Sequence, residues 1–281
     1  MSNIRGFALL AVLAAVNFSP AHSAENPSSR EARRELGKKY LAEGKPKEAK
    51  DLFEALSKSY PNEPDLHLFL ALASLRLRDP TAAEISMRRA LSLEPNHVEA
   101  RTLLGWLSME IRRDFPAAIE AYARVVALKP NWPEAHNNLG VALMKNGDLD
   151  KAIENFSWAV ALKSDYSEAL SNRGWAYAEQ KKWREARADF EQALKFNPDD
   201  EGALYGLSQA LREVRDYAGA EQALRRLIAR APNFVYWLEW GRVEMVRYYW
   251  VFLLVAVLVY LQGRYRRTRR KSDGGSDSQK A

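Results

Sequence analysis

Apolar residues recur along most of this chain with the three- and four-residue spacing of an α-helix, in short blocks separated by polar or proline-containing turns. The block 133–166 is representative of the others. Leu139 and Leu143 supply the apolar face of one predicted helix, and Asn146-Gly147-Asp148 then interrupts the pattern. Phe156 lies on the apolar face of a second predicted helix, so each block predicts two helices joined by a tight turn.

The blocks repeat at nearly constant length. An alanine row has spacings of 34, 35, 34, 34 and 34 residues: Ala49, Ala83, Ala118, Ala152, Ala186 and Ala220. A row of small residues precedes it and a row of large residues follows it: Gly37, Ala71, Gly105, Gly140, Gly174 and Ser208, then Phe53, Met87, Tyr122, Phe156, Phe190 and Leu224. Small residues let helices approach closely and large ones fill the space between units, so one structural unit is repeated. The third block has one extra residue, which we place around residues 111–113.

The clearest copy combines Leu139-Gly140 in the first helix with Ala152, Phe156 and Ala159 in the second. This pattern resembles the tetratricopeptide repeat (TPR) family. The resemblance implies an all-α, right-handed α-solenoid of six stacked helix pairs with a concave face, and favours binding over catalysis. We assign the units to residues 30–63, 64–97, 98–132, 133–166, 167–200 and 201–234.

The N-terminus has the features of a secretory signal peptide. Arg5 precedes an apolar stretch over residues 7–16, and small residues follow at 19–24. We therefore predict a signal peptide over residues 1–23 and a short linker over 24–29. An uncleaved N-terminal anchor is the alternative.

A second apolar run lies near the C-terminus, where residues 248–261 carry no charge. We predict a capping helix over 235–247, a transmembrane helix over 248–262 and a basic cytoplasmic tail over 263–281, with one helix running from about Val235 to Tyr265. The alternative is a buried capping helix, although such a helix needs a polar outer face and this run has none. Together the two ends predict a single-pass protein of the bacterial inner membrane, with its repeats in the periplasm.

Charge and composition exclude several classes of function. The net charge of +6 comes from the two ends, since residues 24–261 hold 34 basic and 34 acidic residues. A nucleic-acid partner is therefore not expected. The chain has no Cys and four His, none of them paired at metal-ligand spacing. We expect no metal, no cofactor and no enzymatic activity.

The resemblance implies that the first helix of each pair lines the concave surface. On that register the candidate peptide-binding residues are Trp106, Met109, Asn137, Asn138, Met144, Asn172, Trp175 and Tyr205. The two tryptophans occupy equivalent positions two units apart, and Asn138 and Asn172 occupy equivalent positions one unit apart. Aromatic side chains anchor partners, and carboxamides bond to peptide backbones. The alternative is that the tryptophans pack between helices and these two asparagines face water.

Acidic residues outnumber basic ones at the predicted inner positions, which favours a neutral or mildly basic partner segment. The sequence thus predicts a membrane-anchored extracytoplasmic scaffold that binds a partner protein or peptide during assembly of an envelope complex. One alternative is a structural subunit that acts through its transmembrane helix or by self-association. Another is an intracellular, tail-anchored TPR receptor.

Overall fold

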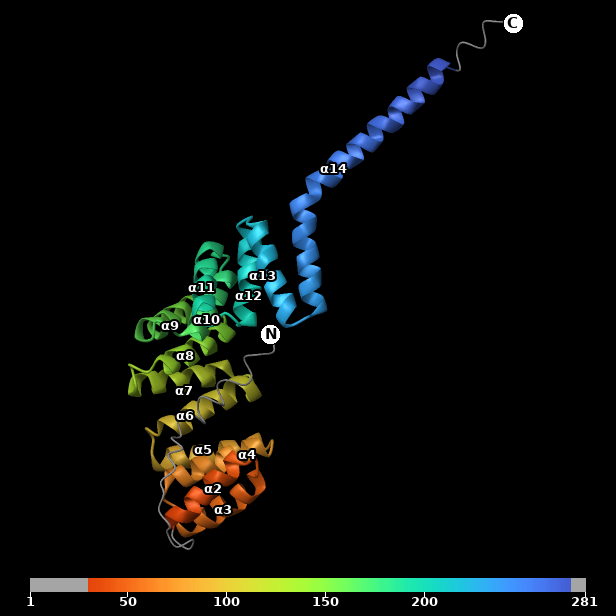
Figure 1. The fold of residues 1–281 in the computed structure, drawn as a ribbon. Helices are drawn as coiled ribbons and strands as arrows, with labels where there is room; N and C mark the ends of the chain where they lie inside the picture. Colours follow the sequence, from red (N-terminus) through yellow and green to blue (C-terminus); the bar gives the residue numbers. More distant parts are fainter. Residues whose placement is uncertain (1–29, 274–281) are drawn as a thin grey trace, which may run out of the picture.

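The computed structural model describes residues 30–273, with side chains as far as Tyr265 except that of Phe252. Helices joined by short turns make up this range, which contains no strand. Figure 1 shows the helices stacked along one axis, from α2 at one end to α14, which leaves the other end as a long rod. The predicted signal peptide, the linker 24–29 and the last eight residues lie outside the described residues.

One helix pair lies in each of the six assigned units. The first helices are α2 (Arg30–Ala42), α4 (Pro64–Arg76), α6 (Val98–Trp106), α8 (Pro133–Asn146), α10 (Ser167–Glu179) and α12 (Glu201–Glu213). The second helices are α3 (Pro46–Ser59), α5 (Pro80–Leu93), α7 (Phe115–Leu128), α9 (Leu149–Leu162), α11 (Trp183–Phe196) and α13 (Tyr217–Arg230). The stack ends in α14 (Phe234–Asp273).

The turn inside every pair places one residue in the left-handed backbone region. Its φ angle lies between 55° and 90° in all six units, at Gly44, Arg78, Arg113, Gly147, Lys181 and Arg215. Only two of the six are glycines, although glycine adopts this conformation at least cost. The interval of 35 residues between Arg78 and Arg113 confirms that the extra residue of the third unit precedes this turn. It widens the end of the first helix into a π-helix, η1 (Leu107–Arg112).

The small and large rows pack against each other within each unit. A Cβ added to Gly140 would lie 2.6 Å from the ring of Phe156, and one added to Gly174 would lie 2.9 Å from the ring of Phe190. Four units pair a glycine with an aromatic ring: Gly37 with Phe53, Gly105 with Tyr122, Gly140 with Phe156 and Gly174 with Phe190. The remaining two carry Ala71 or Ser208 in the small row, and Met87 or Leu224 in the large row. The chain therefore places glycine wherever the large residue is aromatic.

The hydrophobic core runs the length of the stack in overlapping clusters, of which the last reaches Val243 of α14. Some first helices of neighbouring units contact each other, namely α2 with α4, α8 with α10 and α10 with α12, whereas neighbouring second helices in the described range do so at most weakly. The first helices therefore form the inner, more closely spaced side of the solenoid. This arrangement agrees with the predicted concave surface.

The final helix α14 has two parts that meet at a bend. Its first part packs on α13, with Val243 only 1% exposed, and two ion pairs hold it there: Arg212–Glu239 at 2.6 Å and Arg247–Glu221. The parts Phe234–Val251 and Leu253–Tyr265 meet at an angle of 40°, within the predicted span 248–262. Among the described residues, neither part alone has the length and apolar character of a membrane-crossing helix, and the two meet that standard only as a bent pair.

Candidate functional site

An aromatic row crosses the inner side of the last two repeats and continues onto α14. The ring centroids of Trp175 and Tyr205 are 6.2 Å apart, and those of Tyr205 and Tyr236 are 5.6 Å apart. All three side chains are partly exposed. The edge of Trp175 is fixed against the ring of the buried Phe190, with 5.3 Å between centroids. The row is therefore a preorganised surface that still offers ring area to a partner.

Tyr236 was not among the residues predicted from sequence. It stands near the start of α14, where the chain resumes the inner-helix position of a seventh unit without its partner helix. Burial raises the pKa of its phenol, and the nearby Glu201 and Tyr205 raise it further. The pair Trp240-Gly241 resembles Leu139-Gly140 of the fourth repeat. This similarity is the sequence signal from which an inner-helix position for Tyr236 could have been predicted.

The predicted asparagines are not equivalent in the structure. Asn172 is 8% exposed and donates a hydrogen bond of 3.0 Å to Oδ1 of Asn137, which is 1% exposed. Asn137 in turn donates to Glu168 at 3.4 Å, while Asn138 is partly exposed and lies outside this network. The alternative that Asn172 faces water is therefore wrong, because its carboxamide lies in the interface between α8 and α10, where a buried polar group needs a partner.

The predicted tryptophan pair also divides. Trp106 is 9% exposed and belongs to the core of the first three units, whereas Trp175 is partly exposed. Met109 is likewise buried, at 4% exposure, and Met144 is partly exposed. Of the aromatic candidates, only Trp175 and Tyr205 thus present ring surface to solvent. Trp106 and Trp175 occupy equivalent positions in their repeats, yet their side chains are not equally exposed.

Carboxylates stand at the start of the first helices of the last three repeats: Glu134, Glu168 and Asp200. Burial raises the pKa of the Glu168 carboxyl, and the neighbouring Asp200 and Glu134 raise it further because a second negative charge nearby is unfavourable. Neither Glu134 nor Glu168 forms a salt bridge within the described residues. Two carboxylates at the start of repeats 4 and 5 are therefore not neutralised by a cation among the described residues, and both act on the nearby Tyr166.

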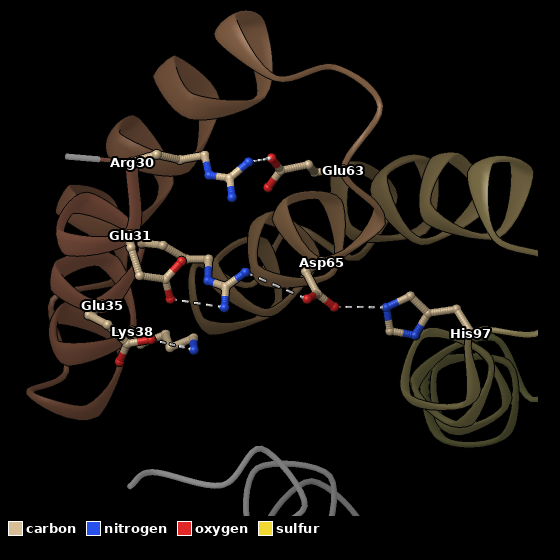
Figure 2. A network of polar contacts seen from close by, with 8 residues as sticks. Arg30, Glu31, Glu35, Lys38, Glu63, Asp65 and His97 are labelled. Carbon is tan, nitrogen blue, oxygen red and sulfur yellow. Dashed lines mark hydrogen bonds and ion pairs between the residues drawn. The ribbon is translucent and has the colours of Figure 1, made fainter. Parts of the chain in front are cut away.

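The opposite end of the inner side is neutralised by its own ion pairs. Figure 2 shows Asp65 reaching toward α2 on one side and toward His97 on the other. Arg34 lies 3.0 Å from Glu31 and 3.9 Å from Asp65, and the Nζ of Lys38 lies 2.6 Å from Glu35. These carboxylates already have cationic partners, so this end offers a weaker electrostatic attraction to a basic ligand.

His97 links the second and third units at this end. Its Nε2 lies 3.1 Å from Asp65 and its Nδ1 lies 3.2 Å from Glu99, with the side chain almost fully buried. The hydrogen bond with Asp65, and next the hydrogen bond with Glu99, raise the pKa of the ring to about 9. The His97–Asp65 bond also lowers the pKa of Asp65. His97 is therefore an imidazolium at neutral pH, held between two carboxylates.

The remaining described histidines support turns. Nε2 of His67 lies 3.2 Å from the carbonyl oxygen of Pro61, and Nε2 of His136 lies 2.8 Å from that of Pro130. Within residues 30–273, no group of three or more His, Asp or Glu side chains is arranged to hold a metal ion.

Comparisons with known proteins agree with this architecture. One model of the tetratricopeptide repeat matches residues 34–98 and 137–200, a second matches 177–238, and a TPR repeat model matches 113–147. No curated protein sequence matches the chain significantly.

Several solved structures share the fold. PilF of Pseudomonas aeruginosa superposes with a TM-score of 0.65 at 19% identity, over 76% of this chain and 96% of PilF. PilW, a widely conserved type IV pilus biogenesis factor, gives 0.65 at 19% identity over 78% of this chain and all of PilW. YrrB, a TPR protein with an unusual peptide-binding site, gives 0.57 at 17% identity over 68% of this chain and 97% of YrrB. With the repeat rows, the helix pairs and the matching family models in agreement, this chain belongs to the tetratricopeptide repeat family.

Proposed function

We propose that this protein is a membrane-anchored, extracytoplasmic TPR scaffold that holds a partner protein or peptide on the inner side of repeats 4–6. The observation that carries the proposal is the aromatic row of Trp175, Tyr205 and Tyr236, which is fixed from behind and partly exposed in front. TPR domains in general are modules for protein interaction rather than enzymes. Rigid aromatic side chains lose little entropy on binding and commonly anchor a partner.

Charge indicates which segments the surface prefers. Burial raises the pKa of the Glu168 carboxyl, and the negative charges of Asp200 and Glu134 raise it further. Within the aromatic row, the charge of Glu201 acts on Tyr236. A Lys or Arg of the partner would offset these negative charges and could also stack on an aromatic ring. The partner segment is therefore neutral to mildly basic, and an acidic segment is disfavoured.

Membrane anchoring rests on the second part of α14. Its apolar side chains are about half exposed or more in the described chain, including Leu253 at 58%, Leu258 at 56% and Val259 at 62%. Apolar side chains around the whole circumference of an isolated helix are unfavourable in water and favourable in lipid. Residues 264–271, which hold six Lys or Arg, would then remain on the cytoplasmic side.

Assembly of an envelope complex is the role that we assign to this scaffold. PilW is described as a pilus biogenesis factor and YrrB as having a peptide-binding site. Those descriptions belong to the relatives, and fold alone does not transfer them. They make a pilus- or secretion-type partner the first class to test.

The binding test compares three forms of the full-length protein. Trp175→Ala combined with Tyr205→Ala removes ring surface from the inner side, whereas Trp158→Ala removes an equally large ring that is 55% exposed on the second helix α9. We expect photo-crosslinking in cells to lose its partner bands with the double variant and to keep them with Trp158→Ala, at unchanged helix content by circular dichroism. Equal crosslinking by all three forms would overturn the groove assignment and favour the structural-subunit alternative.

Topology is tested separately by the mass of the mature N-terminus and by protease access to the repeats. Removal of residues 1–23, together with repeats that protease reaches only from the periplasmic side, is the expected result. An intact Met1 with repeats shielded inside the cell would replace this topology with the tail-anchored receptor.

A further inference from the structure

The first part of α14 has a second apolar face, opposite the one that packs on α13. Val243 is 1% exposed on the packed face. The outer face carries Phe234 at 74% exposure, Leu238 at 53%, Met245 at 64% and Tyr248 at 40%. The last helix of a solenoid normally closes the stack with a polar outer face. Here the outer face is apolar instead, so it has the composition of a helix contact.

The spacing of this face is that of a coiled coil. Phe234, Leu238, Gly241, Met245 and Tyr248 follow one another at intervals of four, three, four and three residues. This is the repeat of positions a and d, the seam along which two helices pack side by side. A Cβ built on Gly241 would meet no atom within 4 Å, so no contact among residues 30–273 explains a glycine there.

We propose that this face, which we call the α14 seam (Phe234, Leu238, Gly241, Met245 and Tyr248), packs against the same face of a second copy in a parallel, two-fold dimer. A parallel pair is self-complementary because each seam residue meets its own counterpart, and the two C-terminal parts then leave in the same direction. The absence of a side chain on Gly241 lets the two helices approach closely at the centre of the seam.

The residues that border the seam fit a parallel pair. Leu238 and Met245 occupy position a. In a parallel pair, the residue directly before position a faces the residue five positions further on in the other helix. Trp237 therefore faces Arg242 of the second copy, and Glu244 faces Tyr249. The Arg242 side chain is 69% exposed, and although its guanidinium pairs with Glu239 at 3.0 Å, its planar face can still lie over an indole ring. A tyrosine hydroxyl can likewise donate to a carboxylate.

The same borders argue against a lipid surface as the occupant. A helix that lies on a membrane carries basic residues along both borders of its apolar face. The α14 seam has Arg242 on one border and Glu244 on the other. These opposite charges suit a self-complementary pair. If the seam lay on a membrane instead, the Glu244 carboxylate would face the lipid headgroups. The seam lies before the 40° bend, so the inference does not depend on the second part of α14 or on the partner surface.

Disulfide trapping tests the dimer directly, because the chain has no cysteine of its own. Leu238→Cys and Met245→Cys place single thiols on the seam. Val246→Cys is the matched control, since Val246 is 45% exposed on the same helix but points away from the seam. In the full-length protein in detergent, mild oxidation should give covalent dimers of the two seam variants, at least about fivefold more than of Val246→Cys. Equal or absent crosslinking of the seam variants would overturn the proposal.

The direction of pairing has its own readout. Positions 238 and 245 are about 10 Å apart along a helix, so a mixture of the two variants should give only like-with-like disulfides. A dominant mixed 238–245 product would exclude the parallel arrangement. A fluorophore at position 245 can also be tested in vesicles that contain brominated lipid. Quenching of this fluorophore, in the absence of dimers, would show that the face contacts lipid instead.

Charge substitution provides a measurement without a crosslink. Met245→Glu should shift the protein–detergent complex from dimer to monomer mass in light scattering, whereas Val246→Glu should leave it dimeric. A monomeric unmodified protein at micromolar concentration would also reject the seam as a dimer contact.

Discussion

Nδ2 of Asn172 donates a hydrogen bond of 3.0 Å to Oδ1 of Asn137 across the interface between the fourth and fifth units. The two side chains come from α10 and α8, and both are more than nine-tenths buried. A hydrogen bond in such a place fixes the register of neighbouring units, because any slip would leave a carboxamide without a partner. It also holds Asn137 in position to donate to Glu168 at the edge of the candidate binding surface.

Asn172→Ala should therefore destabilise the solenoid. The substitution leaves Oδ1 of Asn137 buried without its donor, at a cost of about 1–3 kcal/mol in the free energy of unfolding. Urea denaturation followed by circular dichroism measures this change. Asn138→Ala is the matched control: Asn138 occupies the equivalent position one unit earlier but is partly exposed, so a change within about 0.5 kcal/mol is expected. Equal effects of the two substitutions would mean that the Asn172–Asn137 bond adds nothing to stability.

The pairing of glycine with aromatic rings predicts an interaction that depends on both residues. Gly140→Ala should cost about 1–3 kcal/mol, because its Cβ would lie 2.6 Å from the fully buried ring of Phe156 and the gain in helix propensity is smaller. In the Phe156→Leu background the same substitution should cost much less, since the sixth unit combines Ser208 with Leu224. A double-mutant cycle gives the coupling energy. Additive effects, with no coupling, would contradict the pairing.

His97 makes stability depend on pH. The folded chain raises its pKa from about 6.5 to about 9, so the folded state holds the proton more tightly than the unfolded chain does. The resulting stabilisation is complete below about pH 6.5 and is lost as the pH rises toward about 9. The melting temperature should therefore fall by a few degrees over this range.

His97→Gln separates this effect from other titrations. The variant should melt below the unmodified protein at pH 6, and the difference should shrink by pH 9.5, because only the charged ring is favoured between Asp65 and Glu99. A difference that is constant over the whole pH range would show that the imidazolium contributes nothing to stability.

Sequence rows predicted the fold because packing between units is local and repeated. The alanine row and the glycine–aromatic pairs reappear as buried contacts at the predicted positions. The sequence analysis placed a turn only at Asn146-Gly147-Asp148, and Arg78, Arg113, Lys181 and Arg215 could not be recognised as turn residues because this backbone conformation does not favour them. These residues keep a strained backbone conformation because the packing of the two helices on either side fixes the path of the turn.

The binding surface was harder to predict because register does not determine exposure. Trp106 and Trp175 share a position, yet the widened η1 follows Trp106 and the core of the first three units covers it. Tyr236 was missed because it lies beyond the last complete repeat, at the start of α14, where the repeat period no longer assigns positions. Burial of a particular side chain depends on helix ends and neighbours, which a 34-residue period does not record.

The attachment of α14 to the solenoid predicts a pattern of proteolysis. Val243 is buried against α13, and Arg212–Glu239 and Arg247–Glu221 pin the helix on either side of it. Trypsin should therefore cleave slowly after Arg242 and Arg247 in the native protein, because cleavage requires local unfolding. Val243→Asp buries an uncompensated carboxylate and should speed cleavage at these two sites at least about tenfold. Val246→Asp places the same charge on the exposed side of the same turn and should leave the rate unchanged. Rapid cleavage of the unmodified protein between Glu239 and Tyr248 would show that α14 does not stay on the end of the stack.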